Sequence, residues 1–222
     1  MKICAAQIDG GTHTVHVLND VLNFYGLQTP QGARTLPVEF LWEVLEGTLR
    51  ALCFLHFGVQ DMMLDEPNPN WEPVIHEDVH SENVFLDTGV SNYPRIRLGD
   101  FGISRARAEI REEWEMLPGE DFPEGYDSLD EWEATFTSEA EDLAGMMYQL
   151  CHQHPVGDEW ENGEKLGGET WREGLSEDLR RVLQPLNELK KDLDPRLLEY
   201  TRHVVNTKAE LILAGKLTFE VL

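Results

Sequence analysis

The pattern that most restricts the fold of this chain runs from Phe40 to His56. Its large apolar residues recur at steps of three and four, the spacing that gathers side chains on one face of an α-helix. They are Leu41, Val44, Leu45, Leu49, Leu52 and Leu55. Gly58 stands just past the pattern, where helices commonly end on a glycine. We therefore predict a long amphipathic helix whose apolar face belongs to a core.

Shorter segments with strand character precede and follow this helix. Residues 2–8 predict a short buried strand, and Thr12 is predicted to cap a helix that follows it. After a polar, proline-containing insertion at 58–73, residues 84–86 and 95–98 predict two short strands. The Gly, Asn and Pro residues between these two strands are typical of a hairpin loop.

The second half of the chain is predicted to be helical. Residues 143–152 are apolar on nearly every face and predict a buried helix, and 177–215 predict helices with breaks at Pro185 and Pro195. A length of 222 residues suits one domain with a hydrophobic core. The fold class that follows is α+β, mainly α.

Charge excludes one class of partner. The chain has 18 basic and 42 acidic residues, whereas nonspecific nucleic-acid binding needs an excess of Lys and Arg. The acidic excess is concentrated at 109–142, a segment with fourteen acidic residues and one basic residue, Arg111. Such a run is typical of a solvated loop, and it alternatively offers a surface that prefers a basic protein partner or substrate.

Cysteine content and apolar runs indicate the compartment. Cys4, Cys53 and Cys151 are widely separated and show no CxxC spacing, so we expect buried, reduced thiols rather than a disulfide framework or a zinc site. No apolar run approaches the roughly 20 residues that span a bilayer, and no signal peptide is recognisable. We expect an intracellular protein, cytoplasmic or nuclear, without a membrane partner.

The residues that carry chemistry form one unit: His76-x-Asp78-x-x-x-x-Asn83, a short hairpin, and then Asp100-Phe101-Gly102. Phosphoryl transfer needs few reactive groups in fixed places. One carboxylate accepts the proton of the attacking hydroxyl, while an amide and a second carboxylate hold magnesium against the phosphates. A loop that carries the first carboxylate and the amide, joined by a hairpin to the second carboxylate, brings all three together.

This unit resembles the eukaryotic-type protein kinase family, whose corresponding segments read HRDLKxxN and DFG. The segments FLWEVLEGTLRALCFLH, WEPVIHEDVHSENVFL and YPRIRLGDFG look like those of orphan protein kinases of filamentous fungi. The resemblance implies a kinase-like C-lobe with little or no N-lobe. Residues 1–11 would be the last N-lobe strand and the hinge, 12–222 the C-lobe, and 103–138 an acidic loop like an activation segment.

Roles follow from the resemblance position by position. Asp78 would be the catalytic base, and Asn83 and Asp100 the magnesium ligands for ATP. Ile8 would meet adenine through its backbone, Thr12 would lie near the ribose, and Phe85 would lie under the adenine. These roles imply phosphoryl transfer to Ser or Thr of a protein substrate.

Departures from the family pattern lead us to expect impaired catalysis. The chain starts where the last N-lobe strand should be, with no Gly-rich loop, strand Lys or helix Glu. Glu77 replaces the Arg of kinases that are regulated through their activation loop. His80 replaces the Lys that contacts the transferred phosphate, although a neutral His can still donate a hydrogen bond. Glu139 falls where the buried C-lobe helix usually has Asp.

Two alternatives remain open from the sequence. The missing N-lobe features, Glu77, His80 and the acidic run favour a noncatalytic pseudokinase, a binding module or scaffold built on the same fold. A small-molecule phosphotransferase of the aminoglycoside type also uses an HxDxxxxN loop, often with His at the position of His80. Ile103-Ser104 after DFG and the FLW helix favour the protein kinase branch.

Overall fold

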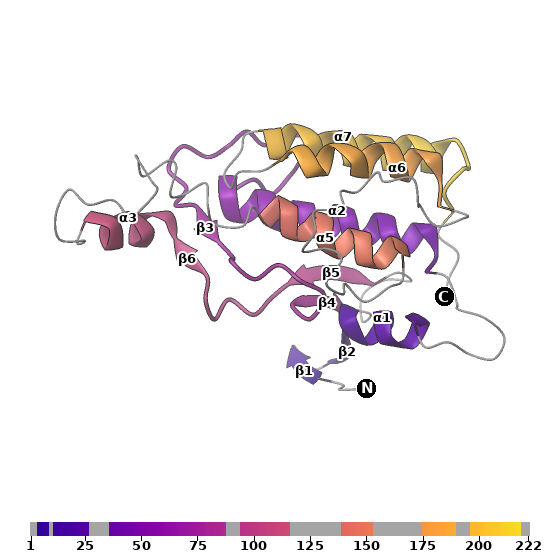
Figure 1. Ribbon diagram of the computed structural model, residues 1–222, viewed down its shortest axis with the longest axis horizontal. Coiled ribbons are helices and arrows are strands. Elements are labelled where there is room, and N and C mark those ends of the chain that lie inside the picture. The colour runs from indigo at the N-terminus through magenta and orange to yellow at the C-terminus, as the bar shows by residue number, and fades with distance from the viewer. Residues whose placement is uncertain are drawn as a thin grey trace.

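The computed structural model describes residues 4–8, 11–26, 36–87, 94–115, 139–152, 175–189 and 196–218. This part of the chain is α+β and mainly helical (Figure 1). Its elements are β1 (Cys4–Ile8), β2 (Gly11–Val17), α1 (Leu18–Gly26), α2 (Val38–Phe57), β3 (Val74–Ile75), β4 (Val84–Asp87), β5 (Arg95–Leu98), β6 (Arg105–Ala106), α3 (Arg107–Glu115), α5 (Glu139–His152), α6 (Glu177–Leu183), the 3-10 helix η2 (Gln184–Glu188) and α7 (Arg196–Leu213).

The central helix is α2, as its apolar periodicity predicts. The helix ends at Gly58, whose φ of 68° is left-handed and whose N–H donates to Phe54 O at 2.9 Å. A glycine adopts this conformation without the steric cost that a Cβ would add. All six apolar residues of the predicted face are buried.

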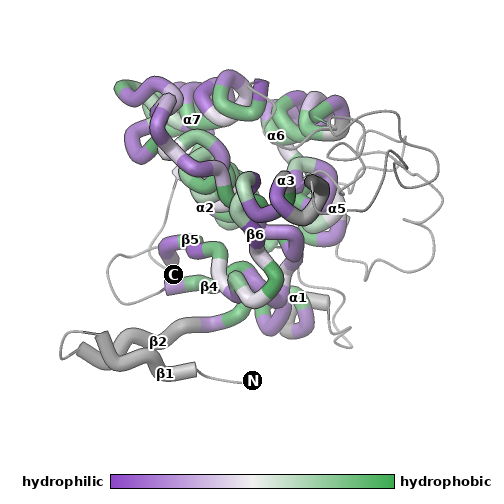
Figure 2. The backbone as a smooth tube through the Cα atoms, turned by 90° about the vertical axis from the view of Figure 1, so that its left-hand side faces the viewer, coloured by the Kyte–Doolittle hydropathy of each residue, from purple (hydrophilic) through white to green (hydrophobic). Residues whose placement is uncertain are grey.

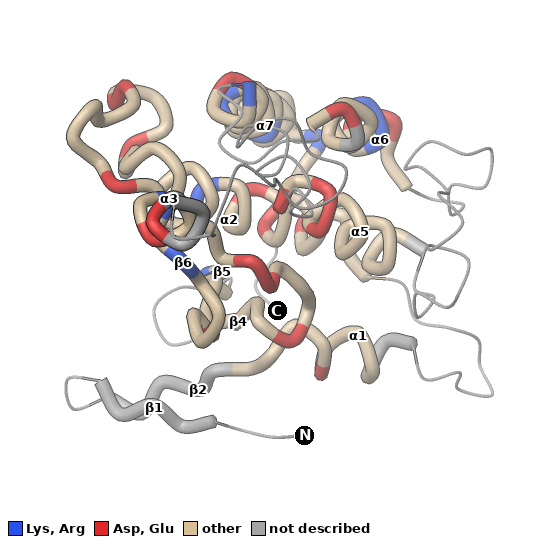
Figure 3. Tube along the Cα trace, turned by 60° about the vertical axis from the view of Figure 1, so that its left-hand side comes forward, with Lys and Arg blue, Asp and Glu red and all other residues tan. Residues whose placement is uncertain are grey.

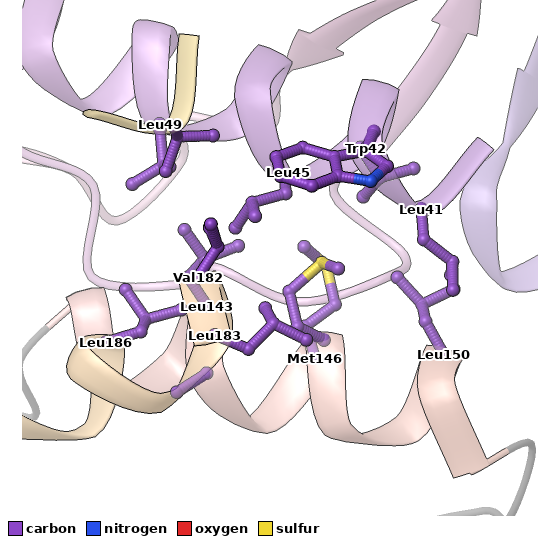
Figure 4. Packing of buried hydrophobic residues seen from close by; sticks show 14 of the residues in the cluster. Leu41, Trp42, Leu45, Leu49, Leu143, Met146, Leu150, Val182, Leu183 and Leu186 are labelled. Carbon is purple, nitrogen blue, oxygen red and sulfur yellow. The ribbon is translucent and has the colours of Figure 1, made fainter. Parts of the chain in front are cut away.

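Helices pack in layers around α2. Figures 1 and 2 show α2 beside α5, with α6 and α7 on one side and the strands β4 and β5 on the other. In Figure 4 side chains from α2, α5, α6 and η2 point toward one another and fill the space between the helices. The labelled ones are Leu41, Trp42, Leu45, Leu49, Leu143, Met146, Leu150, Val182, Leu183 and Leu186. Burial of this apolar surface is the main favourable term for the fold.

Two small antiparallel sheets accompany the helices. The larger has the order β1-β2-β4-β5, and the smaller pairs β3 with β6. β4 and β5 pair as the sequence predicts, with Phe85 opposite Arg97. α2 packs so closely on β5 that a methyl group at Gly47 would overlap with the side chain of Ile96. The sheet therefore rests on the same helix as the core.

The polar insertion at 58–73 contains no helix or strand, as predicted, and is held against the helices by a few side chains. Trp71 Nε1 donates to Leu55 O at 2.8 Å. Arg202 of α7 donates to Met62 O at 2.8 Å and to Asp65 O at 2.6 Å. These contacts fix the path of the chain from α2 to β3.

Three expectations differ from the structure. Thr12 does not cap a helix: it lies in β2, and the helix begins at Leu18, because strand pairing with β4 continues to Val17. The stretch 103–138 is not all loop, since β6 and α3 occupy 105–115, and 116–138 lies outside the described residues. The helix predicted at 143–152 starts four residues earlier, at Glu139.

The later helices and the cysteines follow the predictions where they are described. Pro185 lies in η2, where α6 gives way to a 3-10 helix, while Pro195 lies outside the described residues. Cys53 and Cys151 are buried thiols outside any disulfide, and burial raises the pKa of the Cys53 thiol to about 11. The side chain of Cys4 is outside the described part. Among the described helices, none combines the length and apolar character that crossing a membrane requires.

Candidate functional site

The loop 76–83 is held at both ends by strands. β3 precedes it and pairs with β6, and β4 follows it and pairs with β5. Asn19, in the first turn of α1, adds a third support: its N–H donates to Ser81 O at 3.0 Å and its Nδ2 to Glu82 Oε1 at 3.1 Å. A loop fixed in this way can hold its polar side chains in defined positions.

Asp78 and Asn83 are in direct contact inside this loop. Asn83 Nδ2 donates to Asp78 Oδ2 at 2.7 Å and to Asp78 O at 2.9 Å. The amide of Asn83 therefore points its nitrogen at Asp78. Its Oδ1 makes no hydrogen bond to the described residues, although only 5% of the residue is exposed. The amide is therefore locked with its oxygen available to a ligand.

His80 joins the same pair. Its Nε2 lies 3.2 Å from Asp78 Oδ1 and 3.1 Å from Asn83 Nδ2, and its Nδ1 accepts from the N–H of Glu82 at 3.2 Å. The side chains of Asp78 and His80 are 41% and 43% exposed, so solvent or substrate can reach both.

Asp100 is placed near the loop by the backbone contacts of its neighbour Gly99. It follows β5, and the N–H of Gly99 donates to Asn83 O at 2.9 Å. A Cβ on Gly99 would come within 2.8 Å of the Phe85 ring, so that ring lies directly against the Gly99 backbone. Asp100 itself has a φ of 63°, a left-handed conformation that Asp tolerates better than most residues, and it is exposed. The structure thus places Asp100 next to the Asp78 and Asn83 loop.

His76 is an internal packing residue. It is fully buried, and its Nε2–H donates to Gly99 O at 3.0 Å. The ring meets Phe101 edge to face, with centroids 4.7 Å apart. Ser104 Oγ donates to His76 O at 3.0 Å. These contacts connect the loop to both sides of Asp100.

Glu139 supports the loop from beneath. The carboxylate is fully buried at the start of α5, where Oε1 accepts from the N–H groups of His76 and Glu77, the latter at 3.0 Å. Its Oε2 contacts Nε2 of His56, at the end of α2. Sequence reasoning singled out Glu139 by its position but missed His56 as its partner. The signal available in the sequence was His56 itself, which follows Leu55 near the end of the helical pattern.

Glu77 has a basic partner that the sequence did not reveal. Its carboxylate lies 2.7 Å from a terminal nitrogen of Arg105, and the side chains are 17% and 25% exposed. Arg105 is in β6, where Figure 3 shows the blue of a basic residue. Glu77 has a φ of 64°, so the loop turns sharply there. The pair ties the loop to the strand that follows Asp100.

The remaining predicted site residues lie at the amino-terminal strands. Ile8 ends β1 and Thr12 lies near the start of β2, with Ile8 opposite Gly11 and Thr12 opposite Gln7. Their side chains are outside the described part. β2 pairs with β4, which places Val17 opposite Phe85. The hairpin is therefore joined to the site through β4.

Few of the described side chains are placed to bind a metal ion. The described side chains include no group of three or more His, Cys, Asp or Glu residues that could hold a metal ion. Magnesium, however, takes one or two carboxylates or similar oxygen ligands and keeps several waters. Asn83 Oδ1 and the Asp100 carboxylate fit that requirement in donor type; Asp100 is exposed, and Asn83 is buried with its Oδ1 unused by the described residues.

The chain matches no protein-family model, and no curated protein matches it.

Proposed function

We propose that this chain forms a magnesium–nucleotide site of the protein kinase type, which transfers the γ-phosphoryl group of ATP to a Ser or Thr hydroxyl. The contacts of Asn83 are the observation that carries the proposal. Its amide nitrogen donates to two oxygens of Asp78, and its oxygen is left without a partner among the described residues. An amide locked in this orientation fits a metal ligand better than it fits a turn.

The rest of the site supports the same assignment. Asp100 is exposed beside the loop and offers the second oxygen ligand. Bound magnesium would neutralise charge on the phosphate oxygens. Asp78 carries the carboxylate that is closest to the Asn83 amide, so it lies beside the position where the phosphates would be held.

Phosphoryl transfer in such a site forms one bond to phosphorus and breaks another. The substrate hydroxyl oxygen forms a bond to the γ-phosphorus, and Asp78 takes the hydroxyl proton. The bond between the γ-phosphorus and the oxygen bridging to the β-phosphate breaks, and its electron pair leaves with ADP. Asn83 and Asp100 orient the phosphates, and the hydrogen bond from Asn83 keeps Asp78 from rotating away.

Nucleotide binding tests the proposal directly. Purified protein is titrated with a fluorescent ATP analogue in the presence of magnesium and in the presence of EDTA. We expect magnesium-dependent binding that becomes independent of magnesium in Asp100→Ala. Glu210→Ala is the matched control, because Glu210 is an exposed acid on α7. Wild-type binding that ignores magnesium would refute the assignment of Asp100.

A second candidate function is a noncatalytic binding module. Among the described residues, no Lys or Arg makes a hydrogen bond or ion pair with Asp78, Asn83 or Asp100. A phosphoryl-transfer site ordinarily has such a cation, and the loss of one preorganised contact costs about 10²–10³ in rate. Magnesium-dependent binding without turnover would favour this candidate. Turnover on a basic peptide that Asp78→Asn abolishes would favour the enzyme.

A further inference from the structure

Backbone strain in the described part of the chain lies at the candidate site. Two of the described residues other than glycine have a positive φ: Glu77, at 64°, and Asp100, at 63°. Glu77 directly precedes Asp78, and Asp100 is the proposed magnesium ligand. Side chains disfavour this left-handed conformation, so it persists only where surrounding contacts hold the backbone in place. Asp100 therefore depends on such contacts to keep its carboxylate in position.

The contacts that hold Asp100 are not its own. Its carboxylate is exposed and makes no hydrogen bond or ion pair with the described residues. Its position is set by its neighbours in the chain. On the amino-terminal side, the N–H of Gly99 donates to Asn83 O at 2.9 Å, and Gly99 O accepts from Nε2 of His76 at 3.0 Å. This side of Asp100 is thus fixed to the loop 76–83.

The ion pair of Glu77 with Arg105 is an anchor on the carboxyl-terminal side. Nε and a terminal nitrogen of the guanidinium both contact Oε1 of Glu77, at 2.8 and 2.7 Å. Both side chains are largely buried, so salt and water screen their attraction only weakly. Arg105 also lies opposite Ile75 in the pairing of β3 with β6. The segment 99–105 therefore runs between two anchors, and both anchors bind it to residues 75–83.

We propose that Glu77 and Arg105 are positioning residues that hold Asp100 where it can bind magnesium. This inference rests on the proposed function, in which Asp100 is a magnesium ligand. The pair acts on Asp100 through the backbone of 99–105 and not by contact with the metal or the nucleotide. Groups that support a metal ligand in this way typically change metal affinity by about 10- to 100-fold when they are replaced.

A purely electrostatic role of the pair predicts a different pattern. Arg105→Met leaves the Glu77 carboxylate uncompensated near the site, and an added negative charge attracts Mg²⁺. Glu77→Gln leaves the Arg105 guanidinium uncompensated, and an added positive charge repels Mg²⁺. Charge alone therefore strengthens magnesium binding in the first variant and weakens it in the second. Loss of positioning weakens magnesium binding in both.

Magnesium titrations of nucleotide binding distinguish the two roles. Purified protein is mixed with a fluorescent ATP analogue, and the magnesium concentration at half-maximal binding is measured, with binding in EDTA as the reference. We expect this concentration to rise about tenfold in Glu77→Gln, in Arg105→Met and in the double variant, with binding in EDTA unchanged. The double variant leaves neither charge unpaired, so it remains informative if a single variant fails to fold.

Two further variants complete this titration. Arg105→Lys should stay within about threefold of wild type, because both guanidinium contacts reach one oxygen and an ammonium can donate to that oxygen. Arg181→Met is the control, since Arg181 pairs with Glu177 on the exposed surface of α6, and it should match wild type. Stronger magnesium binding in Arg105→Met, a double variant that matches wild type, or a Lys variant as weak as the Met variant would overturn the proposal.

Amide hydrogen exchange, measured by nuclear magnetic resonance without nucleotide, does not depend on the proposed function. The N–H of Gly99 precedes Asp100, so its exchange reports whether loss of the ion pair is felt across Asp100. In the double variant we expect exchange at Gly99 to accelerate about tenfold, and exchange at Gly58, whose N–H is bonded at the end of α2, to stay unchanged. Unchanged exchange at Gly99, or equal acceleration at Gly58, would overturn the proposal. If wild-type protein binds no magnesium–nucleotide, the proposed function fails, while these exchange rates still decide whether the pair holds Asp100.

Discussion

Replacement of Glu139 is the most informative perturbation of the fold. Its carboxylate is fully buried, accepts the N–H groups of His76 and Glu77, and contacts His56. In Glu139→Ala two buried N–H groups lose their acceptor, at about 1–3 kcal/mol each. The expected loss is therefore about 2–6 kcal/mol, out of a total near 5–15 kcal/mol.

Glu139→Gln should be milder, at about 1–3 kcal/mol. The amide oxygen can still accept both N–H groups of the loop at the position of Oε1. The amide NH₂ then faces Nε2 of His56 as a donor, which forces the ring proton onto Nδ1. Nδ1 is buried and has no hydrogen-bond partner, so that proton is left unsatisfied.

Urea denaturation measures these losses as changes in the free energy of unfolding, from the midpoint at constant m. Amide hydrogen exchange at residues 76 and 77 should accelerate in both variants, because their acceptor is weakened or lost. Glu141→Ala is the control, since Glu141 is exposed in the same first turn of α5, and should stay within about 0.5 kcal/mol of wild type. A Glu139→Ala protein as stable as this control would refute the reasoning.

Two further predictions concern ion pairs. A double-mutant cycle of Glu77→Gln and Arg105→Met should give a coupling energy of about 0.5–3 kcal/mol in urea denaturation, because the pair is largely buried; additive effects would contradict this. The pKa of Glu46 is lowered. Burial raises this pKa, but the ammonium of Lys208, 2.7 Å away, and the guanidinium of Arg50 together outweigh the effect of burial. The pKa of Glu46 in the folded protein is thus below the unfolded value of 4.5. Its ionised carboxylate therefore adds to the free energy of unfolding above that pH, and this stabilisation is lost as the pH falls through the folded pKa. Lys208→Met should cost about 1–3 kcal/mol at pH 7, and its difference from wild type should shrink as the pH falls below 4.5 and the Glu46 carboxylate becomes protonated. A difference that does not change with pH would contradict the pairing.

Much of the local structure could be predicted because it depends on near neighbours. The spacing of apolar residues in α2, with Gly58 at its end, is a helical pattern at short range. Residues 84–86 and 95–98 carry strand composition around a turn, and they pair as expected. Thr12 was misjudged because a capping signal is weak beside the backbone hydrogen bonds that β2 makes with β1 and β4.

The sequence by itself determined the helix α2 and the strands β4 and β5, and it placed Asp78, Asn83 and Asp100 in one unit of chain around a hairpin. Only the tertiary structure decided what holds that unit, because its supports come from far along the chain. Glu139 reaches His76 across 63 positions, and Arg105 reaches Glu77 across 28. Spacing along a chain records periodicity, but it carries no record of which distant side chain will meet a loop once the core has formed.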